Sequence, residues 1–204
     1  MKIEMIDALA WGKMDGLLPA VIQDADTGQV LMLGYQNREA LVATLETGRV
    51  TFFSRSKNRL WVKGETSGNF LSFVSIEADC DADSLVIQAR PQGPTCHRGT
   101  CSCFGEAKAP GLGFLGQLQR VIDQRHHDLP EGSYTTKLFQ QGIDRMAQKV
   151  GEEGVETVIA AKNAELEPLR GEAADLVFHL MVLLRARGLS LADITEKLRE
   201  RHRR

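Results

Sequence analysis

FLSFVSIEADCDADSLVI, residues 70–87, places two β-rich segments on either side of an acidic run. Its Val, Ile, Leu and Phe residues predict strands over residues 70–76 and 85–87. Short β-rich segments upstream predict four more strands, at residues 18–23, 30–35, 50–54 and 60–62. Residues 26–29 have the composition of a hairpin turn, and residues 37–46 predict a helix that Asn37 caps and Gly48 ends. The first half is therefore expected to be α+β.

The acidic run combines hard and soft metal ligands. In an extended segment successive side chains alternate in direction, so the carboxylates of its aspartates are expected on one face and the thiol of Cys80 on the other. Carboxylate oxygens suit Mg²⁺ and thiolates suit Zn²⁺, and a thiolate set of fewer than four leaves room for water. Two different metal ions are therefore predicted. The aspartates are Asp79, Asp81 and Asp83.

The second half has a different pattern. Residues 106–112 have the Pro/Gly-bearing composition of a linker, and beyond them apolar residues recur at helical spacing. Long helices are predicted over residues 143–163 and 171–187. A last helix begins at Ser190 and Asp193, which resemble a capping box, and it ends in a basic tail that we interpret as a solvated helix end. We expect two domains, residues 1–108 and 114–204, joined by a linker at residues 109–113.

Composition restricts the class of protein. The 204 residues are 43% hydrophobic and 25% charged, which suits a folded core, and the formal net charge of -2 offers no basic field for nucleic acid. No apolar run approaches the ~18 residues of a membrane span, and the acidic start is unlike a signal peptide. We therefore expect a cytoplasmic protein without nucleic-acid or membrane partners. Its four cysteines are then expected as reduced thiols that bind metal.

Three familiar metal motifs do not fit. A calcium loop would need Gly where Ser84 stands and Glu where Arg90 stands. A closed zinc knuckle would need two residues between its paired cysteines, whereas Cys101 and Cys103 have one between them. The His-x-Glu and Pro-Cys-x-x-Cys motifs of zinc deaminases are missing from the sequence. Core packing remains the alternative for any single cysteine.

A second group of acids falls on the predicted helices. Glu152, Glu153 and Glu156 lie at spacings of three and four residues, and Glu172 and Asp175 repeat the pattern on the next helix. Like charges at such spacings cost roughly a few tenths of a kcal/mol per pair unless a cation screens them. A site for Mg²⁺ and phosphate would explain the clustering, and an exposed acidic helix face is the alternative.

A basic, hydroxyl-rich segment covers residues 54–69. Its cations and turns are suited to binding phosphate, and Trp61 is available to stack on a base. A charged hairpin with a buried Trp61 is the alternative. The expected substrate-binding residues of this segment are Arg55, Lys57, Trp61, Lys63, Thr66, Ser67 and Gly68.

Together these motifs resemble a known family. WVKGETSG at residues 61–68, DCDAD at 79–83 and GPTCHRGTCSCF at 93–104 closely resemble phosphoribosyl-AMP cyclohydrolase. KVGEEGVET at 149–157 and EAADL at 172–176 resemble phosphoribosyl-ATP pyrophosphohydrolase, an all-α nucleotide pyrophosphatase. The two in this order are similar to the bifunctional enzyme of histidine biosynthesis, over nearly the whole chain.

The resemblance implies the ligands of the N-terminal domain. Residues matching Asp79, Asp81 and Asp83 bind Mg²⁺ in the cyclohydrolase family. Residues matching Cys80, Cys96 and Cys103 bind Zn²⁺, with Cys80 supplied by the partner subunit, so a homodimer with a shared metal site is expected. Cys101 departs from the family pattern, which has a non-ligand such as serine there.

The resemblance also implies two reactions. The C-terminal domain is expected to cleave phosphoribosyl-ATP to phosphoribosyl-AMP and pyrophosphate, using Mg²⁺ held by Glu152, Glu153, Glu156, Glu172 and Asp175. Glu153 and Glu156 are the expected catalytic residues, and Lys149 is expected to bind substrate. The N-terminal domain is expected to open the adenine ring of phosphoribosyl-AMP at N1–C6 with zinc-activated water. His97 is expected to transfer a proton, with a structural role as its alternative.

Two other functions are compatible with the residues. A zinc-stabilised binding module without enzymatic activity, fused to a helical dimerisation domain, would unfold on chelation and turn over no nucleotide. A general nucleotide pyrophosphatase fused to such a module would hydrolyse ordinary nucleoside triphosphates at comparable rates.

Overall fold

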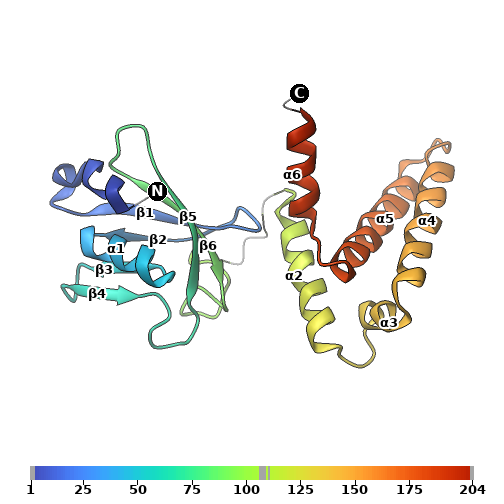
Figure 1. Ribbon diagram of the computed structural model, residues 1–204, viewed down its shortest axis with the longest axis horizontal. Helices are drawn as coiled ribbons and strands as arrows, with labels where there is room; N and C mark the ends of the chain where they lie inside the picture. The colour runs from blue at the N-terminus through green and yellow to red at the C-terminus, as the bar shows by residue number, and fades with distance from the viewer. Residues whose placement is uncertain (1–2, 106–108, 110, 203–204) are drawn as a thin grey trace. The chain divides into compact units, whose positions relative to one another are not determined.

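A computed structural model describes residues 3–105, 109 and 111–202. The chain divides into two units, Met1–Gly116 and Gln117–Arg204, and Figure 1 traces the elements of each. The predicted boundary at residue 108 and residue 110 of the predicted linker lie outside the described residues, as do Arg203 and Arg204 of the predicted basic tail.

The first unit is built on two small sheets. The larger sheet has the strand order β2-β1-β6-β5, and β3 pairs with β4 in the smaller one. β1 and β2 form one antiparallel hairpin, β5 and β6 form another, and the parallel pairing of β1 with β6 joins the two hairpins. The strands are β1 (Leu18–Asp24), β2 (Val30–Gln36), β3 (Thr51–Ser54), β4 (Arg59–Val62), β5 (Leu71–Ala78) and β6 (Leu85–Pro91). All six predicted strands are therefore confirmed.

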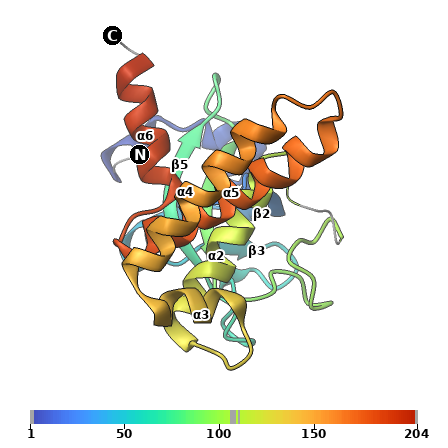
Figure 2. The same cartoon turned by 90° about the vertical axis from the view of Figure 1, so that its right-hand side faces the viewer.

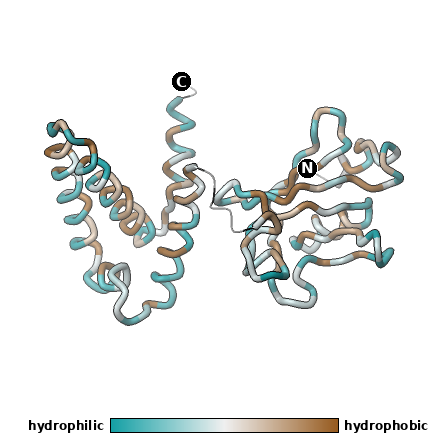
Figure 3. Tube along the Cα trace, turned by 180° about the vertical axis from the view of Figure 1, so that it is seen from behind, coloured by the Kyte–Doolittle hydropathy of each residue, from teal (hydrophilic) through white to brown (hydrophobic). Residues whose placement is uncertain are grey.

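Alternating burial shows how these strands enclose a core. Leu18, Ala20 and Ile22 of β1 are fully buried, with intermediate residues between them, as expected for a strand with one face on the core. Figure 3 shows the hydrophobic stretches along the strands. The helix α1 (Arg38–Thr47) packs beside them, and its predicted ends are confirmed: the Asn37 side chain accepts a hydrogen bond from the N–H of Ala40, and Gly48 has a φ of 67°.

Two short 3-10 helices, η1 (Ile3–Ala8) and η2 (Trp11–Met14), precede β1. They were not predicted. Ile6 of η1 is buried in the core, and the indole N–H of Trp11 donates to the carbonyl of Ile6 at 2.8 Å. These contacts attach the start of the chain to the sheet and bring Lys13 near the hairpin turn between β5 and β6.

The acidic run corrects one expectation. Residues 79–84 form the turn between β5 and β6, so they do not continue a strand, and Ala82 has a left-handed φ of 59°. The predicted alternation of carboxylates and thiol across an extended segment is therefore wrong. The physical reason is that an Asp side chain hydrogen-bonds nearby backbone N–H groups and so favours turns. The carboxylate of Asp79 does this, accepting from the N–H of Asp83 at 2.9 Å and that of Ser84 at 3.1 Å.

The second unit is helical throughout its regular structure, as predicted. Figure 2 shows α4 and α5 side by side, with α3 near one end of the pair. Ser133 caps α3 through its side chain, and the Asp193 carboxylate accepts from the N–H of Ser190 at 2.8 Å, as the predicted capping motif requires. The helices are α2 (Gly113–Asp128), α3 (Tyr134–Gln141), α4 (Ile143–Ala160), α5 (Leu166–Ala186) and α6 (Leu191–His202).

Two helix ends differ from the prediction. α4 ends at Ala160 where residue 163 was expected, and α5 begins at Leu166, five residues before the expected start at Gly171. Pro168 is compatible with the earlier start, because it lies in the first turn, where a missing N–H costs no helical hydrogen bond. Among the described residues, no helix combines the length and apolar character of a membrane span.

Candidate functional site

Two loops enclose a pocket of about 430 Å³ in the first unit. One loop follows β4 and the other follows β6, and they meet at Asn69. A Cβ on Gly64 would lie 2.6 Å from the Asn69 backbone, and a Cβ on Gly93 would lie 2.3 Å from the Asn69 side chain. Gly64 requires glycine, because its φ is 95° and a side chain would meet the backbone of its own loop, whereas a larger residue at Gly93 would have to displace the Asn69 side chain.

Two thiols face each other in this pocket. Cys96 is 8% exposed and lines the pocket together with Cys103, whose thiol is close enough to influence the pKa of the Cys96 thiol. The N–H of Arg98 points at the Cys96 sulfur and lowers the pKa of its thiol. Burial raises the pKa of the Cys103 thiol, and the neighbouring Cys96 adds to that effect. The pair thus favours one thiolate at a time until a cation neutralises both.

The segment around Cys103 is anchored to the sheet. The buried Ser102 hydroxyl donates to the carbonyl of Val30 at 2.8 Å, and the N–H of Cys103 donates to the carbonyl of Leu31 at 2.8 Å. These bonds hold Cys103 at the pocket wall; Cys101 and Cys103 are both exposed, but of the two only Cys103 lines the pocket. The structure thus brings Cys96 together with Cys103, as expected, and leaves Cys101 aside.

Lys63 and His97 add polar groups to the same pocket. Lys63 is 7% exposed, and burial lowers the pKa of its ammonium group, although the nearby thiols of Cys103 and Cys96 act in the opposite direction. Its Nζ donates to the Asn69 carbonyl at 3.4 Å. The Nδ1 of His97 lies 3.8 Å from the Cys96 sulfur. A cation and an imidazole therefore lie beside the thiol pair.

The expected substrate-binding residues of the first unit separate into two groups. Trp61, Lys63, Thr66 and Ser67 line the pocket. The others do not: the Arg55 guanidinium lies 3.8 Å above the Tyr35 ring, in the turn between β3 and β4 that also carries Lys57, and Gly68 has a φ of 76° in the loop after β4. The Trp61 ring stacks on Phe52 with its centroid 5.5 Å away, so its outer face alone is available to a ligand.

The three aspartates of the first unit lie together in the β5–β6 turn. One carboxylate oxygen from each of Asp79, Asp81 and Asp83 falls within 4.8 Å of the others. Hydrogen bonds from the Ser84 side chain and backbone hold the pKa of Asp79 down at about 2. The Lys13 ammonium pairs with Asp81, and with Asp83 at 2.9 Å, and both contacts raise the pKa of the lysine. The turn therefore offers an oxygen cluster that already attracts a cation.

The aspartate turn and the thiol pocket lie at opposite ends of the β5–β6 hairpin. The register pairs Ala78 with Leu85 beside the turn and Leu71 with Pro91 beside the pocket. Eight residues of strand at about 3.3 Å each separate the two ends by roughly 25 Å. Cys80 shares the turn with the aspartates and is exposed. The thiol of Cys80 therefore lies far from Cys96 and Cys103 of the same chain.

A third cluster lies in the second unit. Carboxylate oxygens of Glu153 and Glu156 on α4 and of Glu172 on α5 fall within 4.8 Å of one another. Partial desolvation raises the pKa of Glu156, whose side chain is still exposed, and the charges of Glu153 and Glu172 raise it further. This is the sign expected for carboxylates that repel one another and would gain from a shared cation. The packing of α4 on α5 thus brings three of the five predicted acids together.

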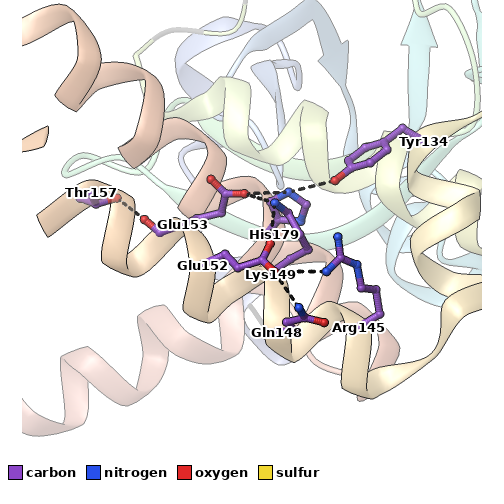
Figure 4. Close-up of polar contacts among 8 residues, drawn as sticks. All are labelled: Tyr134, Arg145, Gln148, Lys149, Glu152, Glu153, Thr157 and His179. Carbon is purple, nitrogen blue, oxygen red and sulfur yellow. Dashed lines mark hydrogen bonds and ion pairs between the residues drawn. The ribbon is translucent and has the colours of Figure 1, made fainter. Parts of the chain in front are cut away.

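The other two predicted acids have different surroundings. Glu152 faces back along α4, where its carboxylate pairs with Arg145 at 3.2 Å and with Lys149 at 3.0 Å and accepts from Gln148 at 2.8 Å (Figure 4). The hydrogen bond from Lys149 is the main cause of the lowered pKa of Glu152. Asp175 is exposed on α5, one helical turn before His179. Neither belongs to the three-carboxylate cluster.

Glu153 is the buried member of this cluster. Its side chain is 6% exposed, and the Lys149 Nζ lies 2.5 Å from its Oε1, a contact that lowers the pKa of Glu153 against the opposing effect of burial. On the other side lies His179 of α5, 4% exposed, whose Nε2 is 3.7 Å from the same oxygen. The hydroxyl of Tyr134 on α3 lies 3.3 Å from that nitrogen (Figure 4).

His179 and Tyr134 were not predicted as site residues from the sequence. His179 stands in the run Asp175-Leu176-Val177-Phe178-His179-Leu180, where a single imidazole among apolar residues resembles ordinary core. The available signal was its position one helical turn after Asp175, which places both on the side of α5 that faces the acids of α4. Tyr134 lies on α3, which was not predicted.

Comparison with known proteins gives matches over both halves. A family model for phosphoribosyl-AMP cyclohydrolase matches residues 32–105, and one for phosphoribosyl-ATP pyrophosphohydrolase matches residues 115–202. The first match contains the thiol pocket and the aspartate turn. The second contains the glutamate cluster.

Curated relatives match along nearly the whole chain. The chain is 60% identical over 200 residues to the histidine biosynthesis bifunctional protein HisIE of Xanthomonas campestris pv. campestris, covering 98% of this chain and 96% of that protein. It is 58% identical over 194 residues to the protein of that name from Bacteroides thetaiotaomicron, with coverages of 95% and 96%. For Escherichia coli (strain K12) the identity is 57% over 194 residues, with 95% of each chain covered.

Proposed function

Because the chain belongs to the family of histidine biosynthesis bifunctional HisIE proteins, which joins a cyclohydrolase and a pyrophosphohydrolase domain, we propose that its two units carry out consecutive hydrolyses on one nucleotide. The helical unit cleaves phosphoribosyl-ATP to phosphoribosyl-AMP and pyrophosphate. The β-rich unit then opens the adenine ring of phosphoribosyl-AMP. The observation that carries the proposal is the separation of ligand types: carboxylates gather on α4 and α5, and thiols gather in the pocket of the first unit.

The glutamate cluster suits Mg²⁺ or a similar hard cation. Its donors are carboxylate oxygens from two helices. Desolvation is the main cause of the raised pKa of Glu156, and the charges of Glu153 and Glu172 add a repulsion that a cation would relieve. Mg²⁺ would supply neutralisation of the triphosphate charge. Glu153, Glu156 and Glu172 would hold it, and Lys149 is placed to keep Glu153 ionised in its buried position. Glu152 and Asp175 lie outside this cluster, and we propose that they are further ligands of Mg²⁺.

The thiol pocket suits Zn²⁺. Cys96 and Cys103 offer two soft donors in contact with each other, and a further thiol from outside the chain would complete a three-ligand set. Zn²⁺ would supply a lowered pKa for a water in its open position. Lys63, Thr66 and Ser67 line the space beside these thiols and are proposed to bind the substrate phosphates.

The ring opening moves both protons of one water. The water oxygen forms a bond to C6 of the adenine and becomes the oxygen of a carboxamide, and one proton goes to the exocyclic nitrogen on C6. The N1–C6 bond breaks, and N1 takes up the other proton. His97 lines the pocket beside Cys96, and we propose that its imidazole delivers this proton. Trp61 presents one ring face to the pocket and is proposed to stack on the base.

We also propose a homodimer in which the partner subunit supplies Cys80. The roughly 25 Å between the two ends of the β5–β6 hairpin keeps this thiol from Cys96 and Cys103 of its own chain. A symmetric dimer brings the turn of one subunit to the pocket of the other in both directions at once. The same turn carries Asp79, Asp81 and Asp83 beside Cys80. Mg²⁺ on these carboxylates would therefore lie at the same interface.

The thiols also indicate the cellular compartment in which the protein acts. Zinc ligation needs reduced cysteines, and the cytoplasm keeps thiols reduced, so we propose that the protein acts there on small-molecule substrates.

The proposal is tested by incubating the protein with phosphoribosyl-ATP, Mg²⁺ and Zn²⁺ and measuring pyrophosphate and ring-opened product in the same samples. Pyrophosphate should appear first, and ring-opened product should follow. Phosphoribosyl-AMP should be the only other nucleotide product that appears. ATP serves as the control substrate. Comparable hydrolysis of ATP would instead identify a general nucleotide pyrophosphatase, and turnover of neither substrate would support the binding module.

A further inference from the structure

We infer that His179, fixed by Tyr134, is a positioning residue for the Glu153 carboxylate. The inference deepens the proposed pyrophosphohydrolase function and rests on it for its activity measurement. Three helices meet at this point: Tyr134 comes from α3, Glu153 from α4 and His179 from α5 (Figure 4). Glu153 is the one buried carboxylate of the described glutamate cluster, so its orientation depends on the groups packed around it.

The geometry places the imidazole edge at this carboxylate. The Nε2 of His179 is 3.7 Å from the Glu153 Oε1 and 3.3 Å from the Tyr134 hydroxyl. The ring itself is held between two aromatic side chains. Tyr134 contacts it edge-on with centroids 5.8 Å apart, and Phe178 does so at 5.2 Å. An imidazole enclosed in this way cannot turn without displacing both rings.

The surroundings also decide which nitrogen carries the hydrogen. An ionised carboxylate only accepts hydrogen bonds, so a bare nitrogen lone pair pointing at Glu153 would be repelled. The other nitrogen, Nδ1, is buried and has no hydrogen-bond partner among the described residues. Leaving a lone pair there costs less than leaving an N–H there. The hydrogen therefore resides on Nε2, between the Tyr134 oxygen and the Glu153 oxygen.

Lys149 completes the arrangement from the opposite side. Its Nζ lies 2.5 Å from the same oxygen of Glu153 that His179 faces. Lys149 pairs directly with this oxygen, whereas the Nε2–H of His179, at 3.7 Å, is beyond hydrogen-bond distance and attracts the oxygen electrostatically. The two groups together orient the carboxylate and leave its second oxygen for a ligand. Donors that orient metal-binding carboxylates typically change metal affinity 10- to 100-fold when they are removed.

Substitutions that keep or remove the N–H separate positioning from packing. In His179→Gln the amide nitrogen stands as many bonds from Cα as Nε2 does, so a donor is retained. His179→Leu fills similar space without a donor. Tyr134→Phe removes the hydroxyl that holds the imidazole and keeps the ring.

Metal binding is measured on the full chain by titrating Mn²⁺ and following free Mn²⁺ by electron paramagnetic resonance, with Glu153→Gln as the baseline that subtracts binding at the aspartate turn. His179→Leu should weaken the Glu153-dependent site by roughly 10-fold or more. Tyr134→Phe should weaken it about fivefold, the effect of one hydrogen bond. His179→Gln should stay within about twofold of the parent, and the Mg²⁺ concentration that half-saturates pyrophosphate release should move in parallel.

Two results would overturn the inference. One is an unchanged Mn²⁺ affinity in His179→Leu, and the other is equal weakening in His179→Leu and His179→Gln, which would indicate packing alone. Helical circular dichroism and its thermal unfolding report whether the helical unit of each variant is folded. If the parent protein released no pyrophosphate, the proposed function would fail while the Mn²⁺ titration would still decide the role of His179.

Discussion

The ammonium group of Lys149 lies 2.5 Å from the carboxylate of Glu153, one helical turn further along α4. A buried carboxylate without a partner would be protonated or displaced, because desolvation penalises its charge. The contact with Lys149 outweighs that penalty and keeps the pKa of Glu153 below its ordinary value. The helical unit thus holds an ionised acid at its centre, facing Glu156 and Glu172, and this arrangement underlies the proposed phosphate chemistry.

Removing one charge from the glutamate cluster should separate the two activities. Glu156→Gln keeps the size of the side chain and removes a proposed Mg²⁺ ligand, so pyrophosphate release should fall at least ~100-fold. Ring opening of added phosphoribosyl-AMP should stay unchanged, because that site lies in the other unit. Glu167→Gln, on the exposed first turn of α5, is the matched control. Loss of both activities in a folded Glu156→Gln protein would contradict separate sites.

The thiol pocket should give the opposite pattern. Cys96→Ser or Cys103→Ser replaces a soft ligand with a hydroxyl, so bound zinc and ring opening should both fall steeply while pyrophosphate release persists. Cys101→Ser is the control, since Cys101 lies outside the pocket lining. Zinc content is read by atomic emission after dialysis. Full zinc in Cys96→Ser, or loss of zinc in Cys101→Ser, would assign the ligands differently.

The aspartate turn gives a prediction for pH. The pKa of Asp79 is about 2, below the ordinary value of ~3.9, because the folded turn donates hydrogen bonds to its ionised form. An acid with a lowered pKa stabilises the fold above its unfolded pKa, and that contribution is lost as the pH falls from about 4 towards 2. Carbon-detected NMR of the side chain should give a midpoint near 2. A midpoint close to 4 would show that the turn does not hold the carboxylate.

The shared zinc site can be tested by mixing two inactive variants. Light scattering should first show a dimer for each. In a hybrid of Cys80→Ser with Cys96→Ser subunits, one pocket regains both its own Cys96 and a partner's Cys80. After refolding of an equal mixture, random pairing should restore about a quarter of the ring-opening activity. Absence of any recovery would place all three thiols within one subunit.

Much of the fold could be predicted because its signals are local. The buried alternation of Leu18, Ala20 and Ile22 and the cap at Asn37 depend on neighbours in the sequence, and both were anticipated. The acidic run was expected to be extended, since composition alone did not show that Asp79 would use its carboxylate to close a turn. The three aspartates were nevertheless expected to lie together, and they do, because the turn brings Asp79, Asp81 and Asp83 close to one another as a strand face would.

The candidate sites were harder to predict than the fold, because they depend on tertiary contacts. Which of the predicted acids lie together follows from the packing of α4 on α5, and no helical periodicity separates Glu152, which pairs with Arg145, from Glu153, which does not. His179 and Tyr134 come from different helices, and their meeting is invisible in the sequence. The position of Cys103 in the pocket likewise depends on the hydrogen bond of Ser102 to β2.

The most direct test of two independent sites is a time course with phosphoribosyl-ATP on a mixture of Glu156→Gln and Cys96→Ser proteins. Alone, the first should release no pyrophosphate and the second should stop at phosphoribosyl-AMP. Mixed, they should convert phosphoribosyl-ATP fully to ring-opened product, because each supplies the site that the other lacks. A mixture that yields neither pyrophosphate nor ring-opened product, although each variant is folded, would contradict the assignment of one hydrolysis to each unit.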